Sequence, residues 1–511
     1  MRLAAIDIGS NSVHMIVADT FGAHSFKVID RERERVKLGA GAFKTGNLRP
    51  DNMKAALEAL QRCATLCRRL KVAKVIATAT SAVREARNGQ EFLATVKQKT
   101  GIEAALISGI DEARMIFDGV CHSTDLQGRR ALVLDLGGGS LEVMVGGADK
   151  LQIAKSLPLG VQRLRDMFGS EDPLPRRTLQ RLERHIDEHA GPLITRIRQR
   201  RIDLVVGTSG THMTLGLCCL RLRGRDPWGS LNGYVIKTAE LNDLAGQLLD
   251  ATAGERSRLP GIDERRADTI HFGAAVLTRV LKHARVKEFQ LSGASLREGM
   301  LLQEMRSHER RPTRPPNVRI SSAFELIVAA GADLDRAAHL AELAISIFDG
   351  TSRLHKLPQR ARDLLETAAL LDDIGRGLNI ADREHLSYQL IRGGGLRGLT
   401  DREIELVGLT ARYSRRGAPK ERHRHFAEMD TDGQHIVRVL AGILRIAYGL
   451  DRGRAGVIRQ VRCRTQGRLL RLFVRAKGNV DLELLAAQQS TKLFAQTIGK
   501  DIDVKLGRNG D

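Results

Sequence analysis

A strand–turn–strand pattern occurs twice in this chain, and it constrains the fold more than any other feature. Residues 5–17 read AIDIGSNSVHMIV, and residues 133–145 read VLDLGGGSLEVMV. The Asp, the Gly and the Ser recur without a gap at one constant offset, and apolar residues flank both turns in the same rhythm. The duplication predicts two similar domains that face each other across a cleft.

The chain around the first repeat alternates between extended and helical patterns. Short apolar stretches predict strands at residues 4–8, 13–18, 74–79 and 102–107. Apolar residues at three- and four-residue spacing predict a helix that Asp51 caps, and residues 91–100 predict another that ends at Gly101. This alternation is typical of an α/β layer architecture.

Each repeated turn combines small residues with a carboxylate at the end of the preceding strand. Gly, Ser and Asn leave backbone N–H groups open to phosphate oxygens. Asp7 and Asp135 would repel such an anion unless a Mg2+ ion lay between them, with Glu142 as a further ligand; another divalent or a monovalent cation is an alternative. One such turn alone is more typical of an ordinary hairpin, but the matched pair predicts phosphate contacts from Ser10, Asn11, Ser12, Gly137, Gly138, Gly139 and Ser140.

The net charge of +22 indicates a polyanionic partner. Alternatively, the charge has no functional meaning, and the Arg-rich composition only reflects a GC-rich genome. Aromatic residues make up only 4% of the chain, which argues against nucleic acid as a partner because single strands need stacking platforms. The sequence has no apolar run long enough for a membrane span and no CxxC pair among its six cysteines, so we expect a cytoplasmic protein without a membrane partner.

The sequence pattern changes after residue 307, where further domains are expected. Residues 307–317 are rich in proline and charge and predict a linker. Helical spacing at 337–348 and 361–371 predicts an all-helical segment, and alternation between 456 and 474 predicts a small α/β end domain. The expected domains are residues 1–124, 125–305, 318–450 and 451–511.

Both turns resemble the phosphate loops of the actin–hexokinase–Hsp70 superfamily. Their variants DIGSNS and LDLGGGSLEV are similar to those of the exopolyphosphatase / guanosine pentaphosphate phosphohydrolase family. The resemblance covers residues 1–305 and implies two ribonuclease H-like (actin-like ATPase) domains. Supporting motifs occur in family order: TATSAVREARNG (78–89), SGIDEAR (108–114), SLPLGVQRL (156–164), GTSGT (207–211) and LSGASLREGML (291–301).

The resemblance also implies roles for individual residues. Glu112 falls where the family has its general base, although the first turn of a helix is a favourable place for any glutamate. Arg84 is a candidate phosphate clamp, or else a surface salt-bridge residue. The GTSGT motif adds Gly207, Thr208 and Ser209 as phosphate-binding candidates. His14 has no evident nucleophile partner and is interpreted as structural.

Residues 318–450 resemble the family's HD-like helical domain, but with a degenerate metal site. His339 stands where the first histidine ligand belongs, whereas the His-Asp pair reads Asp372-Asp373. We therefore expect no working metal centre there, and a hydrogen-bonded pair of Asp373 and His339 instead. The basic side chains of this domain either guide polyphosphate or form a solvated face: Arg392, Arg397, Arg412, Arg415, Arg416, Lys420, Arg422 and Arg424.

These features favour an exopolyphosphatase that hydrolyses terminal phosphate from inorganic polyphosphate with Mg2+ and Glu112. A guanosine pentaphosphate 5′-phosphohydrolase is the alternative on the same site. An ATP-dependent phosphotransferase of the same fold and a non-catalytic polyphosphate-binding protein are further hypotheses. The resemblance also implies a homodimer.

Overall fold

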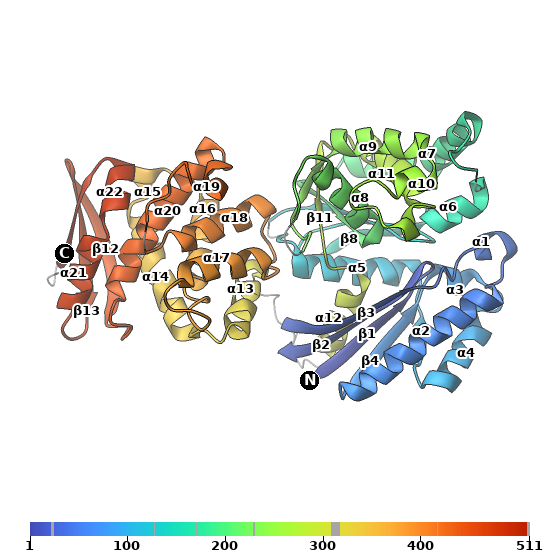
Figure 1. The fold of residues 1–511 in the computed structure, drawn as a ribbon, viewed down its shortest axis with the longest axis horizontal. Helices are drawn as coiled ribbons and strands as arrows, with labels where there is room; N and C mark the ends of the chain where they lie inside the picture. The colour runs from blue at the N-terminus through green and yellow to red at the C-terminus, as the bar shows by residue number, and fades with distance from the viewer. Residues whose placement is uncertain are drawn as a thin grey trace. The chain divides into compact units, whose positions relative to one another are not determined.

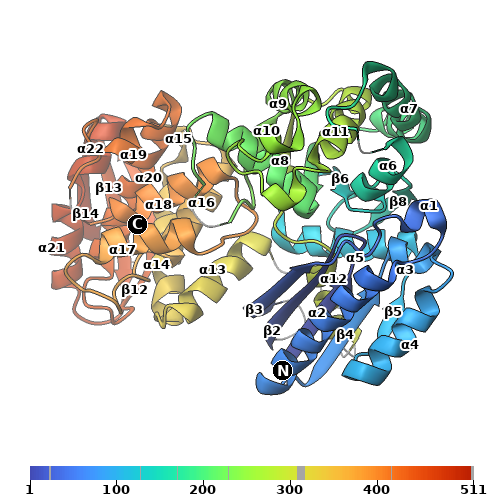
Figure 2. The ribbon, with the colours of Figure 1, turned by 45° about the vertical axis from the view of Figure 1, so that its right-hand side comes forward.

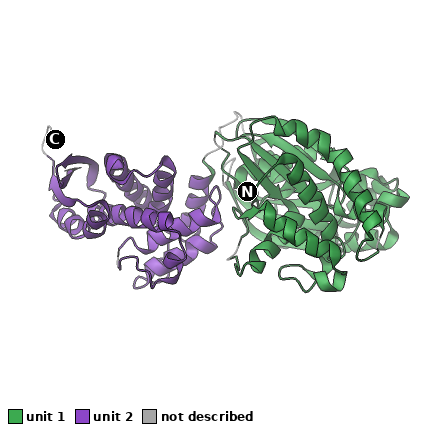
Figure 3. Ribbon diagram, turned by 90° about the horizontal axis from the view of Figure 1, so that it is seen from above, with its two compact units in different colours: residues 1–318 green, residues 319–511 purple. Residues whose placement is uncertain are grey.

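The computed structural model describes residues 1–21, 25–126, 128–169, 171–227, 230–307, 317–415 and 417–507. The chain forms two compact units, residues 1–318 and 319–511 (Figure 3). Most of the predicted linker, residues 308–316, lies outside the described residues. The finer predicted boundaries near residues 124, 305 and 450 stay predictions.

The first unit begins with a five-stranded sheet in the order β3-β2-β1-β4-β5. Apolar residues alternate along its first strand: Ala4, Ile6 and Ile8 pack against the helices on one face, and Leu3 and Ala5 against the other layer. The elements are β1 (Arg2–Ile8), β2 (Ser12–Phe21), β3 (Ser25–Arg35), β4 (Lys74–Ala79) and β5 (Ala104–Leu106), with α1 (Ala42–Thr45), α2 (Pro50–Arg69), α3 (Ser81–Glu85) and α4 (Gly89–Thr100).

A six-stranded sheet follows in the order β10-β11-β9-β6-β7-β8. Its strands are β6 (Ala131–Leu136), β7 (Leu141–Gly146), β8 (Leu151–Leu157), β9 (Leu204–Thr208), β10 (Val235–Lys237) and β11 (Glu288–Leu291). The helices in the same stretch of chain are α6 (Val161–Phe168), α7 (Arg176–Arg198), α8 (Ser209–Leu222), α9 (Thr238–Asp250), α10 (Ala253–Arg256) and α11 (Ile270–Ala284), with a 3₁₀ turn at Glu264–Arg266.

The two sheets share one topology. In each, an antiparallel three-strand meander (β1-β2-β3 and β6-β7-β8) is extended by two parallel strands beside its first strand (β4, β5 and β9, β11). The repeated sequence pattern forms the first hairpin of each sheet. The predicted fold class, a pair of ribonuclease H-like domains, is confirmed.

Two helices form the layers between the sheets (Figures 1 and 2). Helix α5 (Gly109–Ser123) packs against β7 and β8 of the second sheet, while α12 (Leu296–Ser307) packs against β1 of the first, and the two helices pack against each other. Their shared core contains Ala5 and Val133 from the two sheets. Strand alternation therefore aims Asp7 and Asp135 into this middle layer, at the carboxyl ends of β1 and β6.

One predicted helix start is wrong. Helix α2 begins at Pro50 after Arg49, so Asp51 lies inside the first turn and is not the cap. Proline at this position needs no N–H partner and presets the helical φ, which outweighs the capping preference of the next residue. The predicted stop at Gly101 is confirmed, because this glycine adopts the left-handed conformation with φ of 74°.

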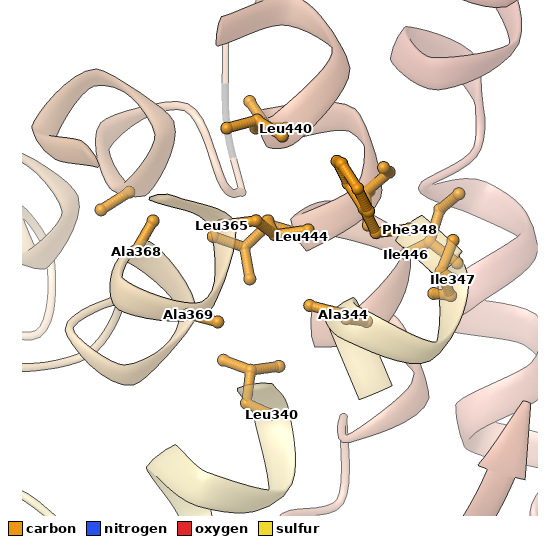
Figure 4. Packing of buried hydrophobic residues seen from close by; sticks show 14 of the residues in the cluster. Leu340, Ala344, Ile347, Phe348, Leu365, Ala368, Ala369, Leu440, Leu444 and Ile446 are labelled. Carbon is orange, nitrogen blue, oxygen red and sulfur yellow. The ribbon is translucent and has the colours of Figure 1, made fainter. Parts of the chain in front are cut away.

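The second unit has a helical part and a small sheet, as predicted. Figure 4 shows the packing of its core, in which α14 contributes Leu340 and Phe348, α16 contributes Leu365, and α20 contributes Leu440 and Leu444. The helices are α13 (Val318–Ala329), α14 (Leu334–Gly350), α15 (Ser352–His355), α16 (Gln359–Leu370), α17 (Arg383–Gly393), α18 (Asp401–Arg412), α19 (Arg424–Ala427) and α20 (Thr431–Leu450). The sheet, in the order β12-β13-β14, has β12 (Ile458–Gln466), β13 (Leu469–Ala476) and β14 (Asp501–Leu506), with α21 (Asp481–Gln489) and α22 (Lys492–Ile498).

No helix in the described part of the chain is both long and apolar enough to cross a membrane. All six cysteines are free thiols.

Candidate active site

The two repeated turns have the same internal geometry. The Gly9 N–H donates to the Ser12 carbonyl at 3.1 Å, and the Gly137 N–H donates to the Ser140 carbonyl at 3.0 Å. Across each hairpin, Asp7 pairs with His14 and Asp135 pairs with Glu142. The register therefore places one acidic strand end beside an imidazole and the other beside a second carboxylate.

A cavity of about 480 Å3 is lined by both turns. Most of the predicted site residues line it: Asp7, Ser10, Asn11, Ser12, Glu112, Asp135, Gly137, Gly138, Gly139, Ser140, Glu142, Thr208 and Ser209. Arg84 and Gly207 are not part of this lining. The structure thus brings Asp7 and Asp135 into one cavity, which the duplicated sequence pattern required.

The second turn lies so close to the first half of the unit that side chains on its glycines would be crowded. A Cβ atom on Gly138 would lie 3.1 Å from the Cβ of Ser10, and one on Gly139 would lie 2.1 Å from the Oγ of Ser81. Ser10 and Ser81 are themselves joined by a hydrogen bond of 2.9 Å between their hydroxyls. Small residues in the second turn therefore let the backbone of one half reach the polar wall of the other.

Three carboxylates of the cavity have raised pKa values in the absence of a cation. Burial raises the pKa of Asp7 to about 7, while nearby Arg297 opposes the rise and Asp135 adds to it. Burial raises the pKa of Asp135 to about 6, although the Ser295 hydroxyl donates to its Oδ2 at 2.7 Å and lowers it. For Glu142, burial and the neighbouring Asp135 raise the pKa to about 7. Together these groups concentrate negative charge where water is scarce.

Glu112 is the fourth carboxylate and comes from the first turn of α5. The helix is capped by Ser108, whose hydroxyl accepts from the Asp111 N–H at 3.1 Å, and this cap orients the turn that carries Glu112. The side chain is buried, and its pKa lies well above the ordinary value because of burial first and of Glu142 and Asp7 next. Its Oε2 lies 3.4 Å from the Nη1 of Arg84. Arg84 therefore contacts the acidic side chain and not the cavity.

The carboxylate cluster suits a hard divalent cation. The Oδ1 atom of Asp7 is buried and accepts no hydrogen bond within the described residues, so a positive partner would relieve its desolvation. No group of three or more His, Cys, Asp or Glu side chains in the described ranges is arranged as a complete metal site. Mg2+ commonly takes one or two protein carboxylates and completes its shell with water and substrate phosphate. Asp7 and Asp135 fit this donor set.

A cationic wall on the same cavity was not singled out by the sequence. Arg33 of β3, Arg266 and Arg297 of α12 all line it, together with His14. The Nη1 of Arg297 lies 3.0 Å from the Nδ1 of His14, and burial together with these three arginines holds the pKa of His14 well below its usual value, so the imidazole is neutral. Within the described residues, Arg297 has no carboxylate at ion-pair distance, although its charge acts on nearby Asp7 and Asp135. Its charge is available for an anion, and its place in the LSGASLREGML motif beside the end of β11 was the signal that could have revealed it.

Comparison with known proteins agrees with this geometry. A model described as Ppx/GppA phosphatase family matches residues 16–308, and one described as Ppx/GppA phosphatase, domain III, matches residues 318–491. Exopolyphosphatase 1 from Mycobacterium tuberculosis and its Mycobacterium bovis counterpart are each 32% identical over 312 residues, 60% of this chain and 89% of theirs. The chain belongs to the Ppx/GppA phosphatase family. The predicted family and the predicted enzyme class, a phosphate-releasing hydrolase, are confirmed.

Solved structures of Ppx/GppA proteins match about three fifths of the chain. An exopolyphosphatase from Cytophaga hutchinsonii has a TM-score of 0.57 and 29% identity, covering 60% of this chain and 99% of its own. The Aquifex aeolicus Ppx/GppA protein has a TM-score of 0.52 and 28% identity, covering 61% and 99%. The chain therefore covers almost the whole length of both solved structures.

In this Ppx/GppA chain, the residues from the GTSGT motif have local partners. The Thr208 hydroxyl donates to the Ala294 carbonyl at 2.9 Å, and the Ser209 hydroxyl donates to the Leu136 carbonyl at 2.8 Å. A Cβ atom on Gly207 would lie 2.3 Å from the ring of His212. These hydroxyls hold the end of β9 against its neighbours, which leaves their contribution to phosphate binding a prediction.

In domain III, the predicted pair of Asp373 and His339 is wrong. The Asp373 carboxylate accepts hydrogen bonds from Arg336 at 2.7 Å and Arg415 at 2.8 Å. The Nε2 of His339 is buried and has no hydrogen-bond partner among the described side chains and backbone. The guanidinium groups occupy the carboxylate because charge-assisted hydrogen bonds are the strong ones. The predicted absence of a working metal centre there stays a prediction.

Several basic residues predicted to guide a polyanion are already paired. Ion pairs join Arg392 to Glu405, Arg397 to Glu325 and Arg424 to Glu428, at 3.1, 2.8 and 2.9 Å. Arg415 lies against Asp372 at 2.6 Å, and Arg416 lies outside the described residues. These pairings engage Arg392, Arg397 and Arg424 with acidic partners, whereas the Arg415 side chain is only 4% exposed and belongs neither to a solvated face nor to a surface that guides polyphosphate.

Proposed function

We propose that this Ppx/GppA phosphatase is an exopolyphosphatase that removes terminal phosphate from inorganic polyphosphate with the help of Mg2+. One observation carries the proposal: a single cavity joins two phosphate-loop turns, the carboxylates of Asp7, Glu112, Asp135 and Glu142, and four arginines. Relatives that are 32% identical bear the name exopolyphosphatase, which supports this substrate. The net charge of +22 also favours a long polyanion.

Different residues of the site bind the phosphate, activate the water and position the base. The backbone N–H groups of the turns around Ser10 and Gly138 hold oxygens of the terminal phosphate. Glu112 accepts a proton from a water molecule while that water's oxygen bonds to the terminal phosphorus. The bridging P–O bond breaks in line, and the departing chain keeps the electron pair on its own oxygen. Arg84 positions the Glu112 carboxylate from outside the cavity.

Bound Mg2+ would neutralise charge on the phosphate oxygens during this step. Asp7 and Asp135 would hold it at the ends of β1 and β6, with Glu142 adjacent to Asp135 across the hairpin. The raised pKa values of these three carboxylates support the assignment, because a cation would stabilise their charged forms.

Parallel assays of phosphate release test the substrate. We expect Mg2+-dependent release from long-chain polyphosphate at least about tenfold faster, by kcat/KM, than from guanosine pentaphosphate, because the site has a cationic wall and no feature that reads guanine. A preference of that size for the nucleotide would establish the 5′-phosphohydrolase instead. Transfer of phosphate from ATP to a sugar would indicate a phosphotransferase, and binding of polyphosphate without turnover would indicate a non-catalytic protein.

Arg297→Gln tests the cationic wall. We expect kcat/KM for polyphosphate to fall by about 10- to 100-fold, since a charge-assisted contact to phosphate is lost while the fold keeps its core. Arg177→Gln on α7 is the matched control, because it removes the same charge from an exposed position. Equal losses in both variants would mean that net charge matters and Arg297 does not.

A further inference from the structure

A second cavity, of about 670 Å3, lies within residues 319–511 and contains none of the residues described above as the active site. It opens between α14 and the turn that follows α16. Its polar side is formed by Arg336, Asp373, Arg376 and Arg454 together with Asp333. Its apolar side is formed by Ala337, Leu340, Leu370, Ile374, Leu378 and Ile380.

One carboxylate that lines this cavity, that of Asp373, is surrounded by arginine side chains. Asp373 lies within 4 Å of the guanidinium groups of five arginines, two of them at 2.7 and 2.8 Å and two more at 3.7 and 3.9 Å. The fifth also donates a hydrogen bond to its Oδ2. The five are Arg336, Arg415, Arg376, Arg383 and Arg454.

Neighbouring acids do not balance these arginines. Asp372 pairs with Arg415 at 2.6 Å, and Asp451 lies 3.0 Å from the Nε of Arg336. Asp333 caps α14 by accepting from the Arg336 N–H at 3.1 Å. With Asp373, these four carboxylates face five guanidinium groups, so a positive charge is left over even when all four are ionised.

Two guanidinium nitrogens that belong to arginines of the cavity lining also lack acceptors. The Nη2 of Arg336 and the Nη1 of Arg376 are buried and have no hydrogen-bond partner in the described ranges. The Arg336 side chain is only 8% exposed, so bulk water does not compensate it. A buried charged donor without an acceptor is costly, so an oxygen-rich anion beside these guanidinium groups would be stabilising.

We propose that this cavity binds a small organic phosphate, with the phosphate at Arg336, Arg376 and Arg454. A phosphate supplies three acceptor oxygens and close to two negative charges, which matches several forked donors better than a carboxylate does. The cavity is larger than a phosphate alone requires and falls in the range of small-molecule sites. The apolar body of the ligand covers Leu378 and Ile380, which are 69% and 65% exposed.

Hydrogen–deuterium exchange on the full chain locates this site without any mutation. Adenosine 5′-monophosphate is the probe, because the flat faces of its aromatic base can pack on aliphatic side chains and it carries a phosphate monoester but no phosphoanhydride for the active site to cleave. We expect it to protect peptides that cover residues 331–340 and 371–380, at a concentration at least about tenfold below that needed with orthophosphate. Protection confined to residues 1–318 would overturn the proposal. Protection of the second unit by tripolyphosphate but not by the nucleotide would overturn it as well.

Paired variants test the named arginines. Arg376→Gln/Arg454→Gln should weaken binding of the probe, measured by calorimetry, by at least about tenfold, because two phosphate donors are lost. Arg353→Gln/Arg459→Gln removes the same charge from exposed positions of the same unit and should bind as the native chain does. Native affinity in the first pair, or an equal loss in both pairs, would contradict the assignment. Phosphate release from polyphosphate should be unchanged in both double variants.

Discussion

Replacing Glu112 with glutamine should lower kcat for phosphate release by about 100- to 10,000-fold, which is the range for loss of a general base. The amide has the shape of the carboxylate but cannot accept the proton of the attacking water. Polyphosphate binding, measured without turnover, should be nearly unchanged, since the turns and the arginines remain. Glu91→Gln, at an exposed position in the first turn of α4, is the matched control. Native activity in Glu112→Gln would remove this residue from the mechanism.

The same variant separates catalysis from a role in helix stability. A glutamate that only favours the start of α5 would lower the thermal midpoint when it is neutralised, because its interaction with the helix dipole is lost. Burial and the nearby carboxylates hold the pKa of Glu112 well above its usual value, so its charged form is unfavourable in the fold. We therefore expect Glu112→Gln to keep or slightly raise the thermal midpoint while it loses turnover. A lower midpoint with native turnover would support the helix role instead.

Replacing Asp7 with asparagine should abolish Mg2+-dependent activity and at the same time stabilise the cation-free protein. The activity loss, expected to be at least about 100-fold, follows from removal of a charged cation ligand. The gain in stability follows because a buried carboxylate with an unpaired oxygen is replaced by a neutral amide. Thermal unfolding with and without Mg2+ measures both effects, and Mg2+ should stabilise the native chain but not the variant.

The pH dependence of the free energy of unfolding tests whether the buried Asp7 carboxylate destabilises the cation-free protein. Burial raises the pKa of Asp7 from its ordinary value of 3.8 to about 7, so between these values the folded protein binds a proton that the unfolded chain releases. The free energy of unfolding of the cation-free native chain should therefore fall as pH rises from about 4 to 7, by on the order of 4 kcal/mol from this group. The fall should be smaller in Asp7→Asn and unchanged in the exposed control Asp243→Asn. A flat profile in the native chain would contradict the buried, cation-dependent role of Asp7.

Local sequence determined the duplicated half of this protein. Apolar alternation and small-residue turns are properties of neighbouring residues, so they predicted the hairpins, the shared sheet topology and the position of Asp7 and Asp135 at equivalent strand ends. The resemblance of the motifs added Glu112, which the structure places in the same cavity.

The tertiary structure alone decided which arginines meet which acids. Arg84 is near Glu112, Arg297 faces His14, and Asp373 gathers arginines in place of His339, because each pairing joins elements far apart in the chain. A long guanidinium side chain is equally compatible with solvent, a salt bridge or a phosphate, and only the packing of distant helices and strands selects among them. Periodicity along the chain carries information about which face is buried, whereas the partner of a charged group depends on the fold that brings the two together.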